Sequence, residues 1–148
     1  MRHFFDVGAN IGSTFDRFLV NTNDFDGQKI WCFEPSPQSW PSLQAKAASM
    51  ANRFKIILCP FGLGLMGAYP FYQQRESEGD TFVADSVAFT GARATPADVH
   101  YELMAMQYPL SMFIIKNTWI EDKITLKLDC EGSEFVILKD LIRSEALA

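Results

Sequence analysis

The chain has 148 residues, 48% of them hydrophobic and 21% charged, a balance typical of a single globular domain (residues 1–148) rather than of a disordered chain. Its formal net charge of -5 and the lack of any Lys/Arg run argue against a nucleic-acid partner. No apolar stretch approaches the ~20 residues of a membrane span, and the short apolar start is no signal peptide, so we expect a cytoplasmic protein.

The first 58 residues alternate between apolar runs and amphipathic segments. Short apolar runs predict three strands, at residues 4–7, 30–33 and 54–58. A helix is predicted over residues 13–20, where Phe15, Phe18 and Leu19 recur at helical spacing. A second helix is expected to begin at Ser39, a good capping residue. This alternation predicts parallel strands joined by helical crossovers.

The second half of the chain is less regular. Residues 68–72 are expected to form an added strand, and Thr95 with Pro96 is expected to begin a helix. The apolar face of that helix would consist of Val99, Leu103 and either Met104 or Met106. Strands are predicted at residues 112–115 and 124–128. A last helix follows a turn at residues 129–132, and one of its faces carries Phe135, Leu138, Leu141 and Ile142. The whole order predicts an α/β fold: a Rossmann-like, mostly parallel sheet with flanking helices.

The first predicted strand ends in an unusual turn. In an open α/β sheet the carboxyl ends of the strands form the edge that binds ligands. Here the strand runs into DVGANIG at residues 6–12, where Gly8 lets the backbone approach a ligand and the helix start offers free N–H groups. An ordinary strand-to-helix turn explains the segment as well. The spacing is neither the G-x-G-x-x-G of dinucleotide folds nor that of a P-loop.

Acidic residues end two further strands. Glu34 follows the second strand, 22 residues after Gly12, where a carboxylate can accept hydrogen bonds from both hydroxyls of a ribose. Because Glu34 occurs together with the glycine-containing turn of the first strand, a ribose-binding role is favoured over that of an exposed loop glutamate. Asp129, Glu131 and Glu134 crowd the end of the strand at residues 124–128. The helix dipole explains an acidic residue at the position of Glu134, near a helix N-terminus. Asp129 and Glu131 are better explained as a general base or as ligands of a metal-binding site.

These motifs resemble those of the FkbM-type methyltransferases, a branch of the class I S-adenosylmethionine-dependent enzymes. The resemblance rests on FDVGANIGSTF, FEPSP and LKLDCEGSEFVILKDL, which occur in the family's order. The last block is the most specific, because the family pattern there is close to K-I-D-x-E-G-x-E. The resemblance implies S-adenosylmethionine as cofactor and O-methylation of a hydroxyl on a sugar, a lipid-linked glycan or a natural product.

The resemblance also implies residue roles. Eight residues would bind the cofactor: Asp6, Gly8, Asn10, Gly12, Glu34, Pro35, Ser36 and Phe61. Glu34 would hold the ribose hydroxyls, and Pro35, Ser36 and Phe61 would lie near adenine. Pro60 stands where the family often has a polar residue, which is a departure at the adenine end. Asp129 and Glu131 would face the transferred methyl group as the candidate catalytic residues.

Methyl transfer to a hydroxyl needs alignment and a base, which we expect to be Asp129 or Glu131. A divalent ion on these oxygen ligands would be Mg or Ca rather than Zn, but two or three acids do not define a metal site and none is assigned. The cysteines lack the paired spacing of a zinc site and are expected to be buried reduced thiols: Cys32, Cys59 and Cys130. His3 and His100 are expected to be structural or exposed.

Two alternatives stay open. A nicotinamide-dependent oxidoreductase would share the fold but needs the missing third glycine. A non-catalytic cofactor-binding module is suggested because the chain is C-terminally short relative to a full class I methyltransferase, which usually has three more strands. The strand at residues 124–128 would then be an exposed sheet edge. Either residues 112–115 would cover it as an extra strand, or a second copy would do so in a homodimer, which we favour.

Overall fold

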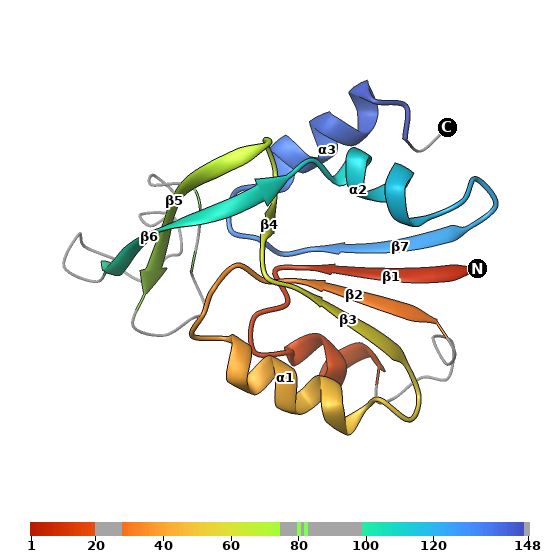
Figure 1. The fold of residues 1–148 in the computed structure, drawn as a ribbon, viewed down its shortest axis with the longest axis horizontal. Helices are drawn as coiled ribbons and strands as arrows, with labels where there is room; N and C mark the ends of the chain where they lie inside the picture. Colours follow the sequence, from red (N-terminus) through yellow and green to blue (C-terminus); the bar gives the residue numbers. More distant parts are fainter. Residues whose placement is uncertain (20–27, 75–79, 81, 83–98, 147–148) are drawn as a thin grey trace.

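The computed structural model describes residues 1–19, 28–74, 80, 82 and 99–146 (Figure 1). A four-stranded sheet lies at its centre, in the order β3-β2-β1-β7, and all three strand pairings are parallel. Its strands are β1 (Arg2–Val7), β2 (Lys29–Phe33), β3 (Lys55–Cys59) and β7 (Lys123–Leu128). The α/β fold with a mostly parallel sheet and flanking helices, which the sequence predicts, is confirmed.

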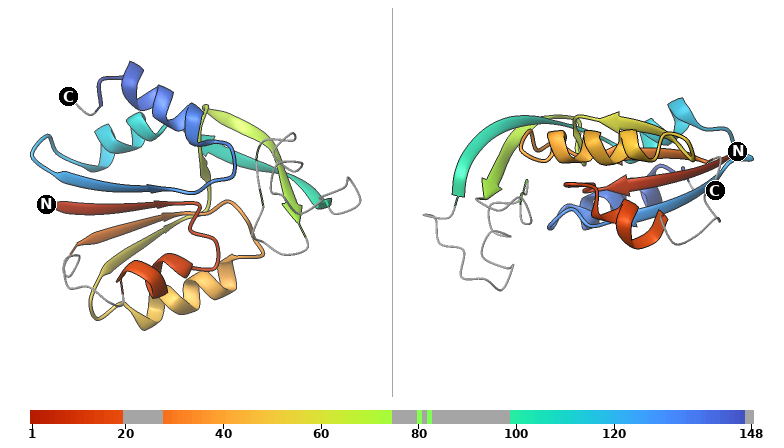
Figure 2. Two further views of the ribbon diagram at one scale, coloured as in Figure 1. Left: turned by 180° about the vertical axis from the view of Figure 1, so that it is seen from behind. Right: turned by 90° about the horizontal axis from the view of Figure 1, so that it is seen from below.

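Helices cover both faces of this sheet, as Figure 2 shows. Successive side chains of a strand point to opposite faces, so Phe4 and Phe5 of β1 belong to two different cores. Phe4 packs with residues of the π-helix η1 (Phe15–Leu19) and of α1 (Trp40–Ser49). Phe5 packs with residues of α2 (Leu110–Asn117) and α3 (Glu134–Arg143). Burial on both faces explains why the central strands β1 and β2 are rich in apolar residues.

The helix predicted after β1 is a π-helix over most of its length. Phe15 and Leu19 are buried, but Phe18 is 55% exposed, so only two of the three expected core residues reach the core. The wider turn of a π-helix changes which residues share a face, and such turns are frequent at functional sites.

A second, three-stranded sheet lies beyond the carboxyl ends of the parallel strands (Figure 1). Its order is β4-β6-β5, and its strands are β4 (Gly62–Leu63), β5 (Gly67–Gln74) and β6 (Val99–Tyr108). β5 confirms the added strand expected at residues 68–72. The helix expected from residue 95 onward is wrong over residues 99–108; Thr95 and Pro96 themselves lie outside the described residues.

The strand β6 is fixed by its partner. It pairs antiparallel with β5 from Gly67↔Gln107 to Gln74↔Val99. Met104 and Met106 are exposed, whereas Gln107 is buried, which is a two-residue period rather than a helical one. Pairing with a neighbour has therefore decided the conformation of a segment whose own apolar spacing also fits a helix.

The strand expected at residues 112–115 is likewise wrong, because this segment lies within α2. Leu110 and Ile114, one turn apart, are buried, while Met112 and Ile115 are exposed. The start of α2 is tied to α3, since the backbone N–H and the hydroxyl of Ser111 donate to Asp140 at 2.8 and 2.7 Å. Residues 112–115 consequently do not extend the sheet beside β7.

The apolar face expected on the last helix is also mostly wrong. Ile137 and Leu141 are the buried residues of α3, whereas Phe135 and Ile142 are 83% and 76% exposed. A residue and its fourth successor lie one above the other on a helix, so the pair 137/141 defines the stripe that meets the sheet and α2. No helix in the described ranges is long and apolar enough to cross a membrane.

Candidate functional site

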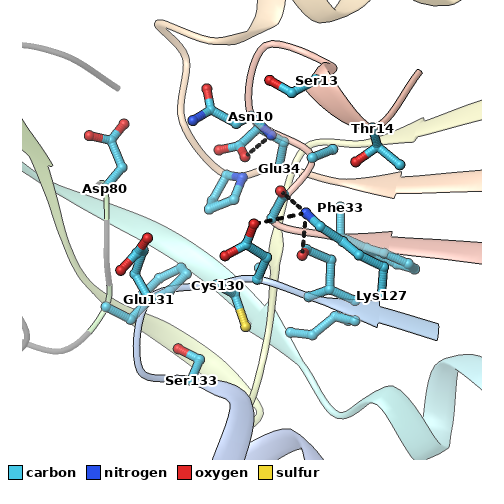
Figure 3. A pocket seen from close by; sticks show the side chains of 18 of the residues that line it. Asn10, Ser13, Thr14, Phe33, Glu34, Asp80, Lys127, Cys130, Glu131 and Ser133 are labelled. Carbon is cyan, nitrogen blue, oxygen red and sulfur yellow. Dashed lines mark hydrogen bonds and ion pairs between the residues drawn. The ribbon is translucent and has the colours of Figure 1, made fainter. Parts of the chain in front are cut away.

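A cavity of about 320 Å³ opens at the carboxyl ends of β1, β2 and β7 (Figure 3). Val7, Phe33 and Lys127 line it from these three strands. Leu63 and Phe71 of the second sheet add apolar walls. The volume falls within the roughly 300–1,000 Å³ of small-molecule sites. The cavity lies where the sequence places the ligand edge of the sheet.

The turn after β1 depends on glycine at its first position. Gly8 has a φ of +74°, and a Cβ at this residue would lie 1.9 Å from the carbonyl oxygen of Asp129. The N–H groups of Gly8 and Ala9 both donate to the carbonyl of Phe33, at 3.1 and 3.2 Å. Glycine is thus required for the backbone of this turn to lie directly against the segment that follows β7.

Glu34 at the end of β2 presents a buried carboxylate to the cavity. One of its oxygens accepts the N–H of Asn10 and the other accepts the N–H of Ser36, both at 2.7 Å. Burial raises the pKa of Glu34 to about 7, and these two N–H donors oppose that rise. Each carboxylate oxygen can accept a second hydrogen bond. Glu34 can therefore bind two further hydroxyl donors.

The segment after β7 is a tight turn held by Glu134. Glu134 accepts the N–H groups of Cys130 and Gly132, both at 2.8 Å. Burial opposes its ionisation, but the N–H donors outweigh burial and lower the pKa of Glu134. Glu131 and Gly132 adopt positive φ values of 49° and 99°. The role of Glu134 is thus to shape the turn that carries the two candidate catalytic acids.

Asp129 and Glu131 both line the cavity but differ in environment. The side chain of Asp129 is 71% exposed. Glu131 is half-buried, and its carboxylate points into the cavity (Figure 3). Burial and the neighbouring charge of Asp129 raise the pKa of Glu131. A raised pKa brings a carboxylate closer to the range in which it accepts protons efficiently near neutral pH.

Lys127 is the main residue of the site that sequence reasoning missed. Its Nζ lies 2.8 Å from the carbonyl oxygen of Gly8, 3.0 Å from Oδ1 of Asp6 and 3.7 Å from Oδ2 of Asp129. Burial raises the pKa of Asp6 above its ordinary value, and the charge of Lys127 offsets only part of that rise. A lysine within the apolar strand KITLKL, one residue before its end, is the sequence signal that could have pointed to it.

The eight residues expected to bind the cofactor divide into two groups. Gly8, Asn10, Glu34 and Pro35 line the cavity, whereas Asp6, Gly12, Ser36 and Phe61 do not. Asp6 lies against Lys127, and the Ser36 hydroxyl accepts the side-chain N–H of Gln73 at 2.7 Å. Phe61 packs edge-on against Phe33 and Tyr108. Asp6 and Phe61 instead contact residues that line the cavity, Lys127 and Phe33.

Further residues line the cavity although the sequence does not predict them as site residues. Ser13, Thr14, Arg17 and Phe18 reach it from the segment after β1, and Asp80 and Phe82 reach it from the region that follows β5. Phe18 was visible in the sequence only as a core residue, and nothing in the pattern around Asp80 and Phe82 indicates a site.

The three cysteines and the possible metal ligands of the chain can also be placed in the structure. Cys32 and Cys59 are buried and Cys130 is half-buried; all three are free thiols. Burial raises the pKa of Cys130, which lines the cavity, so its thiol is a poor nucleophile. Among the residues that the structure describes, no group of three or more His, Cys, Asp or Glu side chains is arranged to hold a metal ion.

The site lies within a segment that matches a known family. Residues 6–146 match the sequence model of the methyltransferase FkbM domain, which covers nearly the whole chain and every strand end described above. No significant match was found among curated proteins or solved structures. The chain belongs to the FkbM methyltransferase family.

Proposed function

We propose that this protein is an S-adenosylmethionine-dependent methyltransferase that methylates a hydroxyl group of a sugar, a glycolipid or a natural product. The observation that carries the proposal is Glu34, a buried carboxylate that lines the cavity at the end of β2. Its oxygens are oriented by two backbone N–H groups, which suits it to accept both hydroxyls of a ribose. Family membership supports the same assignment.

The residues of the cavity fit the parts of this cofactor. Pro35, Phe71 and Phe82 offer apolar surface in the same cavity as Glu34, which suits an adenine ring. Gly8 and Asn10, in the turn after β1, would lie along the methionine part. When bound, S-adenosylmethionine supplies a methyl group on a positively charged sulfur. Asp6 and Ser36 would act through Lys127 and Glu34 rather than by touching the cofactor.

The candidate base lies on the β7 side of the same cavity. Asp129 and Glu131 stand on a turn fixed by Glu134, and either carboxylate can take the proton of an acceptor hydroxyl as the methyl group is transferred. Their negative charge would also stabilise the positively charged sulfur of S-adenosylmethionine in the cavity. Transfer to a hydroxyl is therefore the reaction that these acids support best.

The test is a titration of the purified chain with S-adenosylhomocysteine and with NAD. We expect binding of the first and none of the second. Glu34→Ala is expected to weaken S-adenosylhomocysteine binding by about 1.5–3 kcal/mol, because a charged acceptor of two hydroxyl groups is lost. Glu121→Ala, which removes an exposed acid between α2 and β7, serves as the control.

Three results would contradict the proposal or parts of it. Unchanged affinity in Glu34→Ala removes the ribose assignment. Binding of NAD in place of S-adenosylhomocysteine favours an oxidoreductase. Cofactor binding without methyl transfer to any component of a hydroxyl-rich extract favours a non-catalytic module.

A further inference from the structure

Lys127 connects the two turns that frame the cavity. Its ammonium group lies 2.8 Å from the carbonyl of Gly8 and 3.4 Å from that of Val7, both at the end of β1. On the other side it lies 3.7 Å from the carboxylate of Asp129, beyond the end of β7. Lys127 itself lines the cavity, and its side chain is 21% exposed. One side chain thus contacts both the turn after β1, which contains Gly8, and the candidate catalytic acid Asp129.

The turn after β1 and the segment after β7 are in direct contact at Gly8 and Asp129. The absent side chain of Gly8 would overlap the carbonyl oxygen of Asp129, and the N–H of Asp129 donates to the carbonyl of Val7 at 3.1 Å. A shift of either turn therefore displaces the other. Lys127 donates to the carbonyls of Gly8 and Val7 on one side of this junction and faces the carboxylate of Asp129 as an ion pair on the other side.

Asp6 explains how a lysine can be held at this depth. The carboxylate of Asp6 is 1% exposed, and its Oδ1 lies 3.0 Å from Lys127 Nζ. A buried charge needs an opposite charge nearby, so Asp6 and Lys127 stabilise each other. The geometry leaves Lys127 free to donate to Gly8 in addition, since the carbonyl and the carboxylate lie within reach of the same ammonium group.

We propose that Lys127 is a positioning residue, whose ammonium group fixes the Gly8 turn and the Asp129 end of β7 in the arrangement that binds cofactor, with Asp6 as its buried counter-ion. This inference rests on the proposed function, because its main measurement is the binding of S-adenosylhomocysteine. It assigns to Lys127 no contact with the reacting atoms.

The experiment compares Lys127→Met, Lys123→Met and the double variant Asp6→Asn/Lys127→Met. Lys123 lies at the exposed start of the same strand and controls for the loss of a positive charge. Lys127→Met is expected to raise the Kd for S-adenosylhomocysteine about tenfold or more, through loss of a charged hydrogen bond to the turn. Its Tm is expected to fall as well, because Asp6 then lacks its counter-ion.

The double variant separates positioning from charge neutralisation. Asp6→Asn removes the unpaired charge, so the Tm is expected to recover, while the Kd stays high because the Gly8 carbonyl still lacks its donor. Recovery of wild-type affinity in the double variant would show that Lys127 serves only as the counter-ion of Asp6. Wild-type affinity in Lys127→Met alone would also overturn the proposal.

A second readout does not depend on the cofactor. The N–H groups of Gly8 and Asp129 donate to Phe33 and Val7 at the junction, so their hydrogen exchange reports its rigidity. Both should exchange faster in the double variant and be unchanged in Lys123→Met. Unchanged exchange in the double variant contradicts the inference. If the wild-type protein does not bind S-adenosylhomocysteine, the proposed function fails, and exchange alone decides the role of Lys127.

Discussion

Glu34 carries a carboxylate on which burial and hydrogen bonding act in opposite directions. Burial raises its pKa to about 7, although the N–H groups of Ser36 and Asn10 oppose the rise. Hydroxyl donors of a ribose favour the ionised form, so binding should lower this pKa. The affinity for S-adenosylhomocysteine is therefore expected to rise with pH, by up to about tenfold per unit, and to level off above neutrality. Calorimetry between about pH 5 and about pH 9 checks this, and the Glu34→Gln variant should lose the dependence.

The same raised pKa affects folding of the free protein. Because the folded-state pKa lies above the ordinary value of 4.5, the native state binds a proton more tightly than the unfolded chain does. The free energy of unfolding, measured relative to Glu34→Gln, should therefore fall as pH rises from 4.5 to about 7, by at most about 1.4 kcal/mol per unit. Urea unfolding of both proteins at several pH values measures it. If the difference in free energy of unfolding between the two proteins does not depend on pH, burial does not raise the pKa of Glu34.

Asp129 and Glu131 are to be distinguished by their amide variants. Asp129→Asn is expected to abolish methyl transfer while largely sparing the fold and its Tm, because an amide cannot accept the proton of a hydroxyl at neutral pH. Transfer of a labelled methyl group to a hydroxyl-rich extract provides the rate, and Glu131→Gln is the matched variant. A wild-type rate in Asp129→Asn, with loss in Glu131→Gln, would move the role of base to Glu131.

The residues of the cavity differ in how visible they are in the sequence. Glu34, Asp129 and Glu131 could be predicted to line one cavity, because parallel strands bring their carboxyl ends to one edge. The sequence marks Lys127 as an unusual lysine within an apolar strand, but it does not predict which groups its side chain contacts. Its contact with the carbonyl of Gly8 depends on the register of β7 against β1, in which Lys127 lies beside Asp6. A sequence pattern gives the strand and its end, but not this pairing.

At the scale of elements, the parallel sheet could be predicted and two segments of the second half could not. The strands β1, β2, β3 and β7 are largely apolar runs bounded by turn residues, and their parallel direction follows from the alternation with helices. Short apolar runs without a clear period fit either a strand or a helix. The residues of α2 and β6 are of this kind, and their tertiary partners α3 and β5 decide between the two.

A chain of side-chain hydrogen bonds joins three elements at the amino end of β1. Trp31 donates to Nδ1 of His3 at 3.0 Å, and Nε2 of His3 lies 3.1 Å from Asp122. The indole can only donate, so Nδ1 accepts and Nε2 carries the proton. Trp31→Phe leaves a buried acceptor without this donor and is expected to lower the free energy of unfolding by about 1–3 kcal/mol. Trp119→Phe, at an 80% exposed side chain, should change it little, and equal effects in urea unfolding would contradict the prediction.

For the whole molecule, the side of the sheet next to β7 suggests self-association. Within the described ranges β7 pairs only with β1, and Figure 1 shows α2 and α3 on this side. Large apolar side chains are exposed on these helices and the loop that follows α2: Ile115, Trp119, Ile120, Phe135 and Ile142. An open strand edge and exposed apolar side chains are both typical of protein–protein contacts. Because a two-fold axis can place the same surface on both sides of an interface, we expect a homodimer.

Sedimentation over a range of micromolar concentrations tests this expectation. The variant Phe135→Ser/Ile142→Ser removes two of the most exposed apolar side chains of α3 and should weaken the dimer while the Tm is nearly unchanged, since both residues are exposed in the monomer. Leu65→Ser/Met66→Ser is the matched control, because these side chains are 59% and 49% exposed in the turn between β4 and β5. A dimer that resists the α3 substitutions would place the interface along the edge of β7. A monomer at every concentration would show that neither the edge of β7 nor the exposed apolar side chains of α3 drive association of this chain with itself.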